Sequence, residues 1–182
     1  MKKKVILDLC GGTGSWSKPY QEAGYSVHVI TLPGDVRLIP SGGYEFPVYG
    51  ILAAPPCDHF AGSGARWWKE KGANKLLEGL SIVDACIRII HVTKPIFWAL
   101  ENPVGRLKDY LGEPVYKFHP CDFGDPYTKK TLLWGKFNLP KRNPVKPTEG
   151  SKLHRLPPSA KRKELRSITP QGFAKAFMEA NP

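Results

Sequence analysis

The sequence lacks any long apolar run. Its most hydrophobic stretches, residues 5–9 and 96–100, extend over about five residues, against the roughly 20 that a membrane-spanning helix requires. The basic start Lys2-Lys3-Lys4 leads directly into a strand-like segment, and not into the apolar core of a secretion signal. We therefore expect a cytoplasmic protein with no membrane partner.

Cysteine is scarce, and its four copies, Cys10, Cys57, Cys86 and Cys121, lie far apart in the chain. They form no CxxC pair, and no histidine stands at a zinc-site spacing from them. The sequence therefore predicts neither a disulfide framework nor a metal site. Free thiols in a reducing compartment are the simplest interpretation.

Acidic residues are in deficit: 16 aspartates and glutamates face 27 lysines and arginines, which gives a net charge of +11. This excess favours a polyanionic partner such as DNA, although a merely soluble basic protein can have the same composition. The length of 182 residues suits one α/β domain with a sizeable core and is short for two.

Strand-like and helix-like segments alternate through the first part of the chain. We predict strands over residues 5–9, 25–31, 49–54 and 96–101, with a helix ending at Ala23 and a long one over residues 75–92. This alternation predicts an α/β fold with a mostly parallel sheet and helices on both faces. Two later strands, over residues 115–118 and 131–134, are expected to form an antiparallel edge.

The composition changes between residues 138 and 166, where prolines and basic residues alternate. Because such a stretch cannot build a core of its own, we interpret it as an extended basic arm that a phosphate backbone would order. The alternative is a solvated linker. Beyond it, Phe173, Ala176, Phe177 and Ala180 share one face of a short C-terminal helix.

A glycine-rich turn, Gly11-Gly12-Thr13-Gly14, joins the first strand to a helix. Such a turn presents backbone amides to an anionic or nucleotide-like ligand. This one lacks the lysine of a phosphate-cradling loop and fits GxGxxG poorly, so it favours a cofactor with an amino-acid end, such as S-adenosylmethionine, over a dinucleotide. A plain turn is the alternative interpretation.

Two further predicted strands end in reactive side chains. Cys57 follows Pro55-Pro56, which stiffen the turn and fix where the thiol points. Glu101 ends the strand over residues 96–101, where a charged side chain is expected to serve either a ligand or a lysine. Ligands of open parallel sheets bind outside the carboxyl ends of the strands, so both residues are candidates for one site.

Together these motifs resemble the DNA cytosine-C5 methyltransferase family over most of the chain. Residues 8–16 are similar to the family's cofactor loop, Pro55-Pro56-Cys57 to its nucleophile motif, and Glu101-Asn102-Pro103 to its Glu-Asn-Val motif. Residues 123–131 are similar to the segment that carries Gln-x-Arg-x-Arg, with lysines for arginines, and residues 167–171 to the C-terminal motif. Roughly 30 residues stand where a target-recognition domain is usual, as in compact bacteriophage forms.

The resemblance implies a Rossmann-like S-adenosylmethionine-dependent methyltransferase fold that acts on DNA and binds no metal. The implied catalytic residues are Cys57, Glu101 and Lys130. The implied cofactor-binding residues are Asp8, Cys10, Gly11, Gly12, Gly14, Ser15, Trp16, Thr31, Asp35, Pro55, Ser167 and Thr169. The implied substrate-binding residues are Pro56, Arg66, Asn102 and Lys129.

Three parts of the chain are expected on this basis: a catalytic and cofactor-binding domain over residues 1–137, a basic arm or minimal recognition segment over 138–166, and a C-terminal helix over 167–182 that completes the domain. Departures from the family are local. Cys10-Gly11 replaces Phe-Ala, and Thr31 stands where an acid holds the cofactor ribose, with Asp35 close behind it.

In the implied chemistry the Cys57 thiolate adds to C6 of cytosine while Glu101 hydrogen-bonds the ring. The base must leave the duplex for this to happen, and Trp67 and Trp68 are candidates to stack on its neighbours or are simply packed in a loop. Two other hypotheses stay open: the same chemistry on RNA or a free cytidine nucleotide, and a silent nucleic-acid-binding module. The sequence leaves the oligomeric state open.

Overall fold

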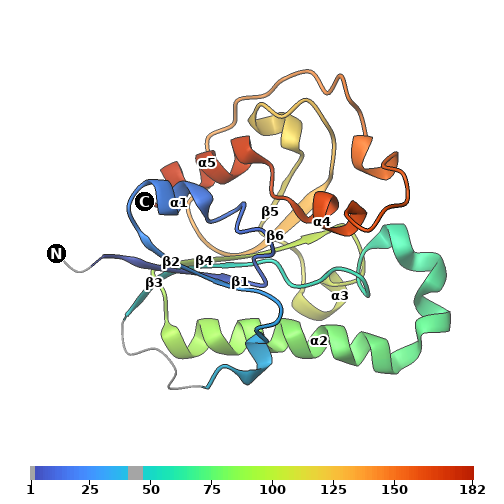
Figure 1. Ribbon diagram of the computed structural model, residues 1–182, viewed down its shortest axis with the longest axis horizontal. Helices are drawn as coiled ribbons and strands as arrows, with labels where there is room; N and C mark the ends of the chain where they lie inside the picture. Colours follow the sequence, from blue (N-terminus) through green and yellow to red (C-terminus); the bar gives the residue numbers. More distant parts are fainter. Residues whose placement is uncertain (1–2, 41–46) are drawn as a thin grey trace.

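A six-stranded sheet forms the centre of the computed structural model, which describes residues 3–40 and 47–182 (Figure 1). The strands follow the order β2-β1-β3-β4-β6-β5. Their bounds are β1 Val5–Leu9, β2 Ser26–Ile30, β3 Val48–Ala53, β4 Phe97–Pro103, β5 Tyr116–Phe118 and β6 Thr131–Lys136. Residues 1–2, part of the basic start of the chain, lie outside the described residues.

The first four strands are parallel, and β6 runs antiparallel to both β4 and β5. The predicted mostly parallel sheet with an antiparallel edge is therefore confirmed. Each observed strand lies within two residues of its predicted bounds, because apolar runs bounded by glycine, proline or polar residues leave little choice of position.

Helices cover both faces of the sheet, with α2 on one face and α1 and α5 on the other (Figure 1). The α-helices are α1 Lys18–Glu22, α2 Trp68–Thr93, α3 Lys108–Leu111, α4 Arg162–Ser167 and α5 Gln171–Ala180. The short 3-10 helices are η1 Val36–Leu38, η2 Gly62–Trp67, η3 Pro120–Phe123 and η4 Lys152–His154. None of the helices in the described residues is long and apolar enough to cross a membrane.

Helix α2 begins seven residues earlier than the predicted start at Lys75, and it is interrupted at Gly72, where φ is 69° and ψ is −177°. The apolar periodicity marked only the part of the helix that packs on the sheet. The turn before Gly72 lies beside the loop that carries Cys57, since Lys71 Nζ donates to the Asp58 carbonyl oxygen at 2.7 Å.

The arm over residues 138–166 is not extended throughout, because it contains η4 and α4. Its first part is bonded to η3: Asn143 N donates to Asp122 O at 2.9 Å, and Val145 N donates to Cys121 O at 2.8 Å. Beyond the arm, Phe173 and Phe177 of α5 are fully buried against the sheet. The C-terminal helix is therefore part of the core.

Strand register brings the predicted motifs to one edge of the sheet. Leu9 of β1 pairs with Ala53 of β3, and Ala53 pairs with Leu100 of β4. The residues that follow these three positions are the glycine-rich turn, the Pro-Pro-Cys turn and Glu101. Three segments that are far apart in the chain therefore begin side by side.

Candidate active site

The glycine-rich turn after β1 has a conformation that depends on its glycines. Gly12 and Gly14 have φ values of 55° and 69°, in the left-handed region that favours glycine. A Cβ atom on Gly11 would lie 2.4 Å from Cγ of Asp8, so no side chain fits there. Gly11 N donates to Ile30 O of β2 at 3.2 Å, which ties the turn to the neighbouring strand.

Asp8 lies directly beneath this turn and is fully buried. Its Oδ2 accepts a hydrogen bond of 2.5 Å from the Ser17 hydroxyl, and its Oδ1 has no hydrogen-bond partner among the described residues. Burial raises the pKa of Asp8 to about 6, while the hydrogen bonds from Ser17 act in the opposite direction. The chain thus holds a carboxyl group that changes charge just below neutral pH.

We expect the wild-type protein to lose stability as pH rises because Asp8 ionises. Asp8→Asn should abolish this pH-dependent loss. The folded-state pKa of about 6 lies above the ordinary value of 3.8, so ionisation disfavours the folded state progressively between about pH 4 and pH 6. At 1.36 kcal/mol per pKa unit, the cost above pH 6 is up to about 3 kcal/mol.

Denaturant unfolding of both proteins at pH 4 and pH 7 measures this effect. The free energy of unfolding of Asp8→Asn relative to wild type should rise by about 2 to 3 kcal/mol between the two pH values. Comparing two pH values cancels any fixed cost of the asparagine amide. If the free energies of unfolding of variant and wild type differ by the same amount at both pH values, the charge on Asp8 does not destabilise the folded state.

The C-terminal segment before α5 returns to the glycine-rich turn, as the resemblance implies. Thr169 N donates to the Ser15 hydroxyl at 2.8 Å. A Cβ atom on Gly12 would lie 3.9 Å from Oγ of Ser167, so the turn and this segment face each other closely. Backbone amides and two serine hydroxyls therefore gather at one place, which fits the polar amino-acid end of a cofactor.

Two predicted cofactor residues direct their side chains elsewhere. The Trp16 ring is buried against Phe173 and Phe177 of α5, with ring centroids 5.9 and 5.5 Å away. The Cys10 side chain packs on the core beside Cys86, whose hydrogen bond lowers the pKa of the Cys10 thiol. Cys10 remains partly exposed.

The two predicted positions after β2 are also arranged differently from expectation. Thr31 is exposed, and its carbonyl oxygen accepts from Gly34 N at 2.8 Å in a tight turn. The Asp35 carboxylate accepts from the Arg37 backbone and forms an ion pair of 2.6 Å with its guanidinium. A ligand hydroxyl at Asp35 would therefore have to share this carboxylate with Arg37.

The turn that carries Cys57 is fixed on both sides. The buried Asn102 amide donates from Nδ2 to Pro55 O at 2.9 Å, and the backbone amides of Phe60 and Ala61 both donate to Cys57 O at 2.9 Å. Pro55 is buried, Pro56 is exposed and Cys57 is half-buried. The thiol is thus held at the surface of the site by a rigid frame.

The frame continues into the segment after β4, which no sequence motif assigned to the site. Arg106 N donates to Phe60 O, and Gly62 N donates to Val104 O, at 2.9 and 2.8 Å. A Cβ atom on Gly105 would lie 1.9 Å from Phe60 O, so only glycine permits this contact. The sole signal in the sequence was a glycine soon after the Glu-Asn-Pro motif.

Glu101 lies beside a lysine at the edge of the site. In β4 and β6, Glu101 pairs with Leu133 and Pro103 pairs with Thr131, so Lys129 continues the same face of the sheet. Lys129 Nζ lies 3.8 Å from Glu101 Oε1, and each side chain is only about one-fifth exposed. A partly buried ion pair therefore spans these two elements.

The structure does not bring Lys130 and Arg66 to this ion pair. Lys130 is exposed, and it is the preceding residue, Lys129, whose ammonium group contacts Glu101. Arg66 is also exposed in η2, with its guanidinium 5.0 Å from the ring centroid of Trp67. Adjacent residues in an extended segment point to opposite sides, and the sequence alone does not show which of them faces the site.

Several charges act on the Cys57 thiol. Burial raises its pKa most, followed by the negative charges of Glu101 and Asp58, while Lys129 and Arg166 act to lower it. The net result is a pKa above the ordinary thiol value. Arg166, from the end of α4, is a cation that no sequence motif assigned to the site.

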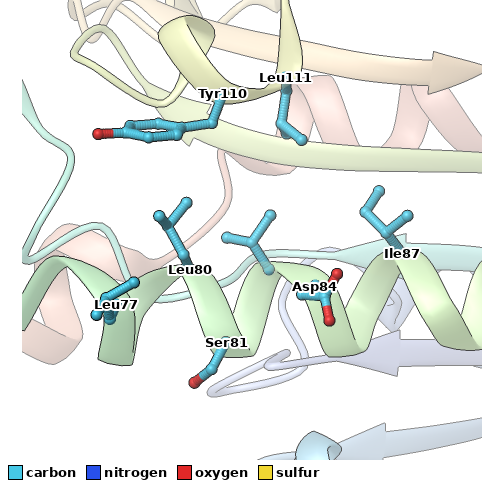
Figure 2. A pocket seen from close by; sticks show the side chains of 8 residues that line it. Leu77, Leu80, Ser81, Asp84, Ile87, Tyr110 and Leu111 are labelled. Atoms are coloured by element: carbon cyan, nitrogen blue, oxygen red, sulfur yellow. The ribbon is translucent and has the colours of Figure 1, made fainter.

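A separate apolar hollow of about 470 Å³ lies between α2 and α3. Figure 2 shows Tyr110 and Leu111 facing Leu80 and Ile87 across it. None of the predicted site residues lines this hollow, so it is distinct from the site around Cys57. In the described residues, no group of three or more histidine, cysteine or acidic side chains is arranged to hold a metal ion.

Comparison with known proteins gives two relatives in sequence, while no protein-family model matches the chain. It is 31% identical over 104 residues to the type II methyltransferase M.SacI of Streptomyces achromogenes, covering 53% of this chain and 24% of that protein. It is 27% identical over 175 residues to the type II methyltransferase M.DdeI of Desulfomicrobium norvegicum, covering 71% and 39%. The chain thus spans well under half the length of both.

Two solved structures share the fold. One is described as a DNA modification methyltransferase encoded within a prophage (E. coli), with a TM-score of 0.54 and 16% identity over 86% of this chain and 49% of that one. The other is the Entamoeba histolytica methyltransferase EhMeth, with a TM-score of 0.52 and 13% identity over 88% and 62%. The chain therefore has the Rossmann-like fold of S-adenosylmethionine-dependent methyltransferases, as expected.

Proposed function

We propose that this chain is a DNA cytosine-C5 methyltransferase in which Cys57 is the nucleophile and Glu101 its acidic partner. The observation that carries the proposal is the placement of the two groups. They follow paired positions of neighbouring strands, close enough for the Glu101 charge to act on the Cys57 thiol. The glycine-rich turn begins from the next strand along the same edge.

The residues around that turn suit S-adenosylmethionine, which would supply an electrophilic methyl group. The backbone of residues 10–14, the Ser15 hydroxyl and Ser167 with Thr169 surround the position for its amino-acid end. We assign Pro55, which is buried two residues before Cys57, to the cofactor side of the nucleophile turn. Asp35, close to the end of β2, is assigned to the nucleoside end, where its pairing with Arg37 would have to adjust.

The chain's own groups account for activation of the cytosine ring. The Cys57 thiolate adds to C6, and a protonated Glu101 hydrogen-bonds N3, so the negative charge that builds on the ring is tolerated. After C5 is methylated, a water molecule or a nearby base takes the C5 proton, and the C6–S bond breaks to release the Cys57 thiolate and restore the aromatic ring.

We assign Lys129, and not Lys130, to the site, since its ammonium group pairs with Glu101. Asn102 supports the nucleophile turn through Pro55, and Pro56, which is exposed in that turn, is assigned to contact the substrate. Arg66 and the half-exposed Trp67 project from η2 and suit a role on the DNA strand around the flipped base. The arm over residues 138–166 is assigned as a minimal recognition segment between the catalytic parts 1–137 and 167–182.

Transfer of tritiated methyl from labelled S-adenosylmethionine tests this function. The protein is offered duplex DNA, single-stranded DNA, RNA and free cytidine nucleotides in separate reactions. Label in 5-methylcytosine of DNA supports the proposal. Label in RNA or nucleotides alone would reassign the substrate, and salt-dependent DNA binding without any cofactor affinity would identify a silent binding module.

A further inference from the structure

Helix α4, within the basic arm, lies against the nucleophile loop. Lys163 Nζ forms an ion pair of 2.7 Å with Oδ2 of Asp58, the residue after Cys57. At the end of the same helix, Arg166 O accepts a hydrogen bond of 3.2 Å from Lys129 Nζ, the cation that pairs with Glu101. One short helix thus contacts partners of both groups proposed to act on cytosine.

These contacts matter because the surroundings of Cys57 are unfavourable to a thiolate. Two negative charges face it, Glu101 from β4 and Asp58 from its own loop, and burial adds to their effect. Three cations oppose them: Lys129 before β6, and Lys163 and Arg166 of α4. Two of the three therefore come from the arm, outside the sheet that positions the thiol.

The contacts also fix the geometry of this corner. The hydrogen bond from Lys129 to Arg166 O tethers the end of α4 beside the Glu101 ion pair, and Ser167 then leads to the glycine-rich turn. The ion pair of Lys163 is exposed, at 78% for the lysine and 44% for Asp58, so its energy is small and sensitive to salt. This ion pair therefore favours one position of the loop that carries Cys57, and it contributes little to the stability of the fold.

We propose that α4 belongs to the catalytic apparatus, with Lys163 and Arg166 as positioning residues that balance the acids around Cys57 and favour its thiolate. The inference rests on the proposed nucleophilic role of Cys57. It assigns to the arm a task in addition to contact with DNA, and it explains why a segment without a core folds a helix at this place.

The rate of Cys57 alkylation by iodoacetamide as a function of pH tests the proposal without substrate or cofactor. Peptide mass spectrometry separates Cys57 from the other cysteines. Lys163→Met and Arg166→Met remove the positive charge and keep an unbranched apolar side chain, so each should raise the apparent pKa of Cys57 by about half a unit, and both together by about one. Below the pKa, alkylation then slows about threefold for each single variant.

Lys161→Met is the matched control, since Lys161 is exposed at the start of α4 and also carries one positive charge. It should leave the Cys57 profile unchanged, as should the conservative variants Lys163→Arg and Arg166→Lys. An unchanged profile in Lys163→Met and Arg166→Met would overturn the proposal. An equal shift in Lys161→Met would also overturn it, because the effect would then be that of net charge.

Methyl transfer gives a second readout. In Arg166→Met the rate should fall about threefold near neutral pH and recover at higher pH, where the thiol ionises without help. Unaltered alkylation of Cys121, in η3, verifies that each variant is folded. If the thiol profiles shift as expected but no substrate is methylated, the proposed function fails and not the electrostatic role of α4.

Discussion

Cys57→Ser is expected to abolish methyl transfer, with a loss on the order of 10³-fold or more. A serine hydroxyl at this place is hardly ionised near neutral pH, and the half-buried position beside Glu101 and Asp58 opposes a negative charge further. The replacement changes one atom in a turn whose backbone bonds do not involve the thiol. The fold and cofactor binding should therefore survive.

Tritium transfer to DNA measures the rate of this variant, and calorimetry measures its affinity for S-adenosylmethionine. Cys121→Ser is the matched control, because that cysteine is also half-buried and free but lies in η3. It should retain full activity. Methyl transfer by Cys57→Ser at more than a tenth of the wild-type rate would remove covalent catalysis by this residue.

Glu101→Gln is expected to lower methyl transfer by about 10²- to 10⁴-fold, the usual contribution of a positioned acid. Glutamine keeps the size of the side chain but has no acidic proton and no charge for Lys129. The same change removes a charge that raises the pKa of Cys57. Alkylation of Cys57 should therefore become faster while methyl transfer becomes slower.

These opposite signs separate a direct role of Glu101 from a structural one, since a damaged site would slow catalysis without a defined gain in thiol reactivity. Glu113→Gln, which removes a surface acid paired with Lys117, serves as the control and should change neither rate. If Glu101→Gln methylates DNA at the wild-type rate, the assigned partnership of the two residues is wrong.

Much of the fold was predictable from the sequence because its signals are local. The apolar runs fix each strand within two residues, the helical periodicity marks the part of α2 that packs on the sheet, and the alternation of strands and helices fixes the class of sheet. The motifs also indicated which strand ends to compare. The register that aligns Leu9, Ala53 and Leu100 follows from packing and was seen only in the structure.

The direction of individual side chains was not predictable. Trp16 lies in a cofactor-like motif but is buried in the core, since burial of its apolar surface outweighs a role at the surface of the turn, and the partly buried Cys10 packs against the core. Lys129 and Lys130 are adjacent, and only the pairing of β4 with β6 shows which of them meets Glu101.

The arm was the least predictable part. Its prolines and lysines indicate a segment without a core, and that is consistent with its first half, which is bonded to η3 mainly through backbone groups. The helix α4 depends on tertiary partners, Asp58 and Lys129, that are far away in the chain. No local sequence pattern predicts an ion pair between residues 58 and 163.

Formation of a covalent complex with DNA tests the central claim most directly. A duplex in which cytosines are replaced by 5-fluorocytosine is incubated with the protein and S-adenosylmethionine, and the products are analysed by denaturing mass spectrometry. Fluorine at C5 blocks the final elimination, so we predict a stable species with the mass of protein, oligonucleotide and one methyl group, linked through Cys57. Absence of this species, under conditions in which unmodified DNA is methylated, would contradict the account.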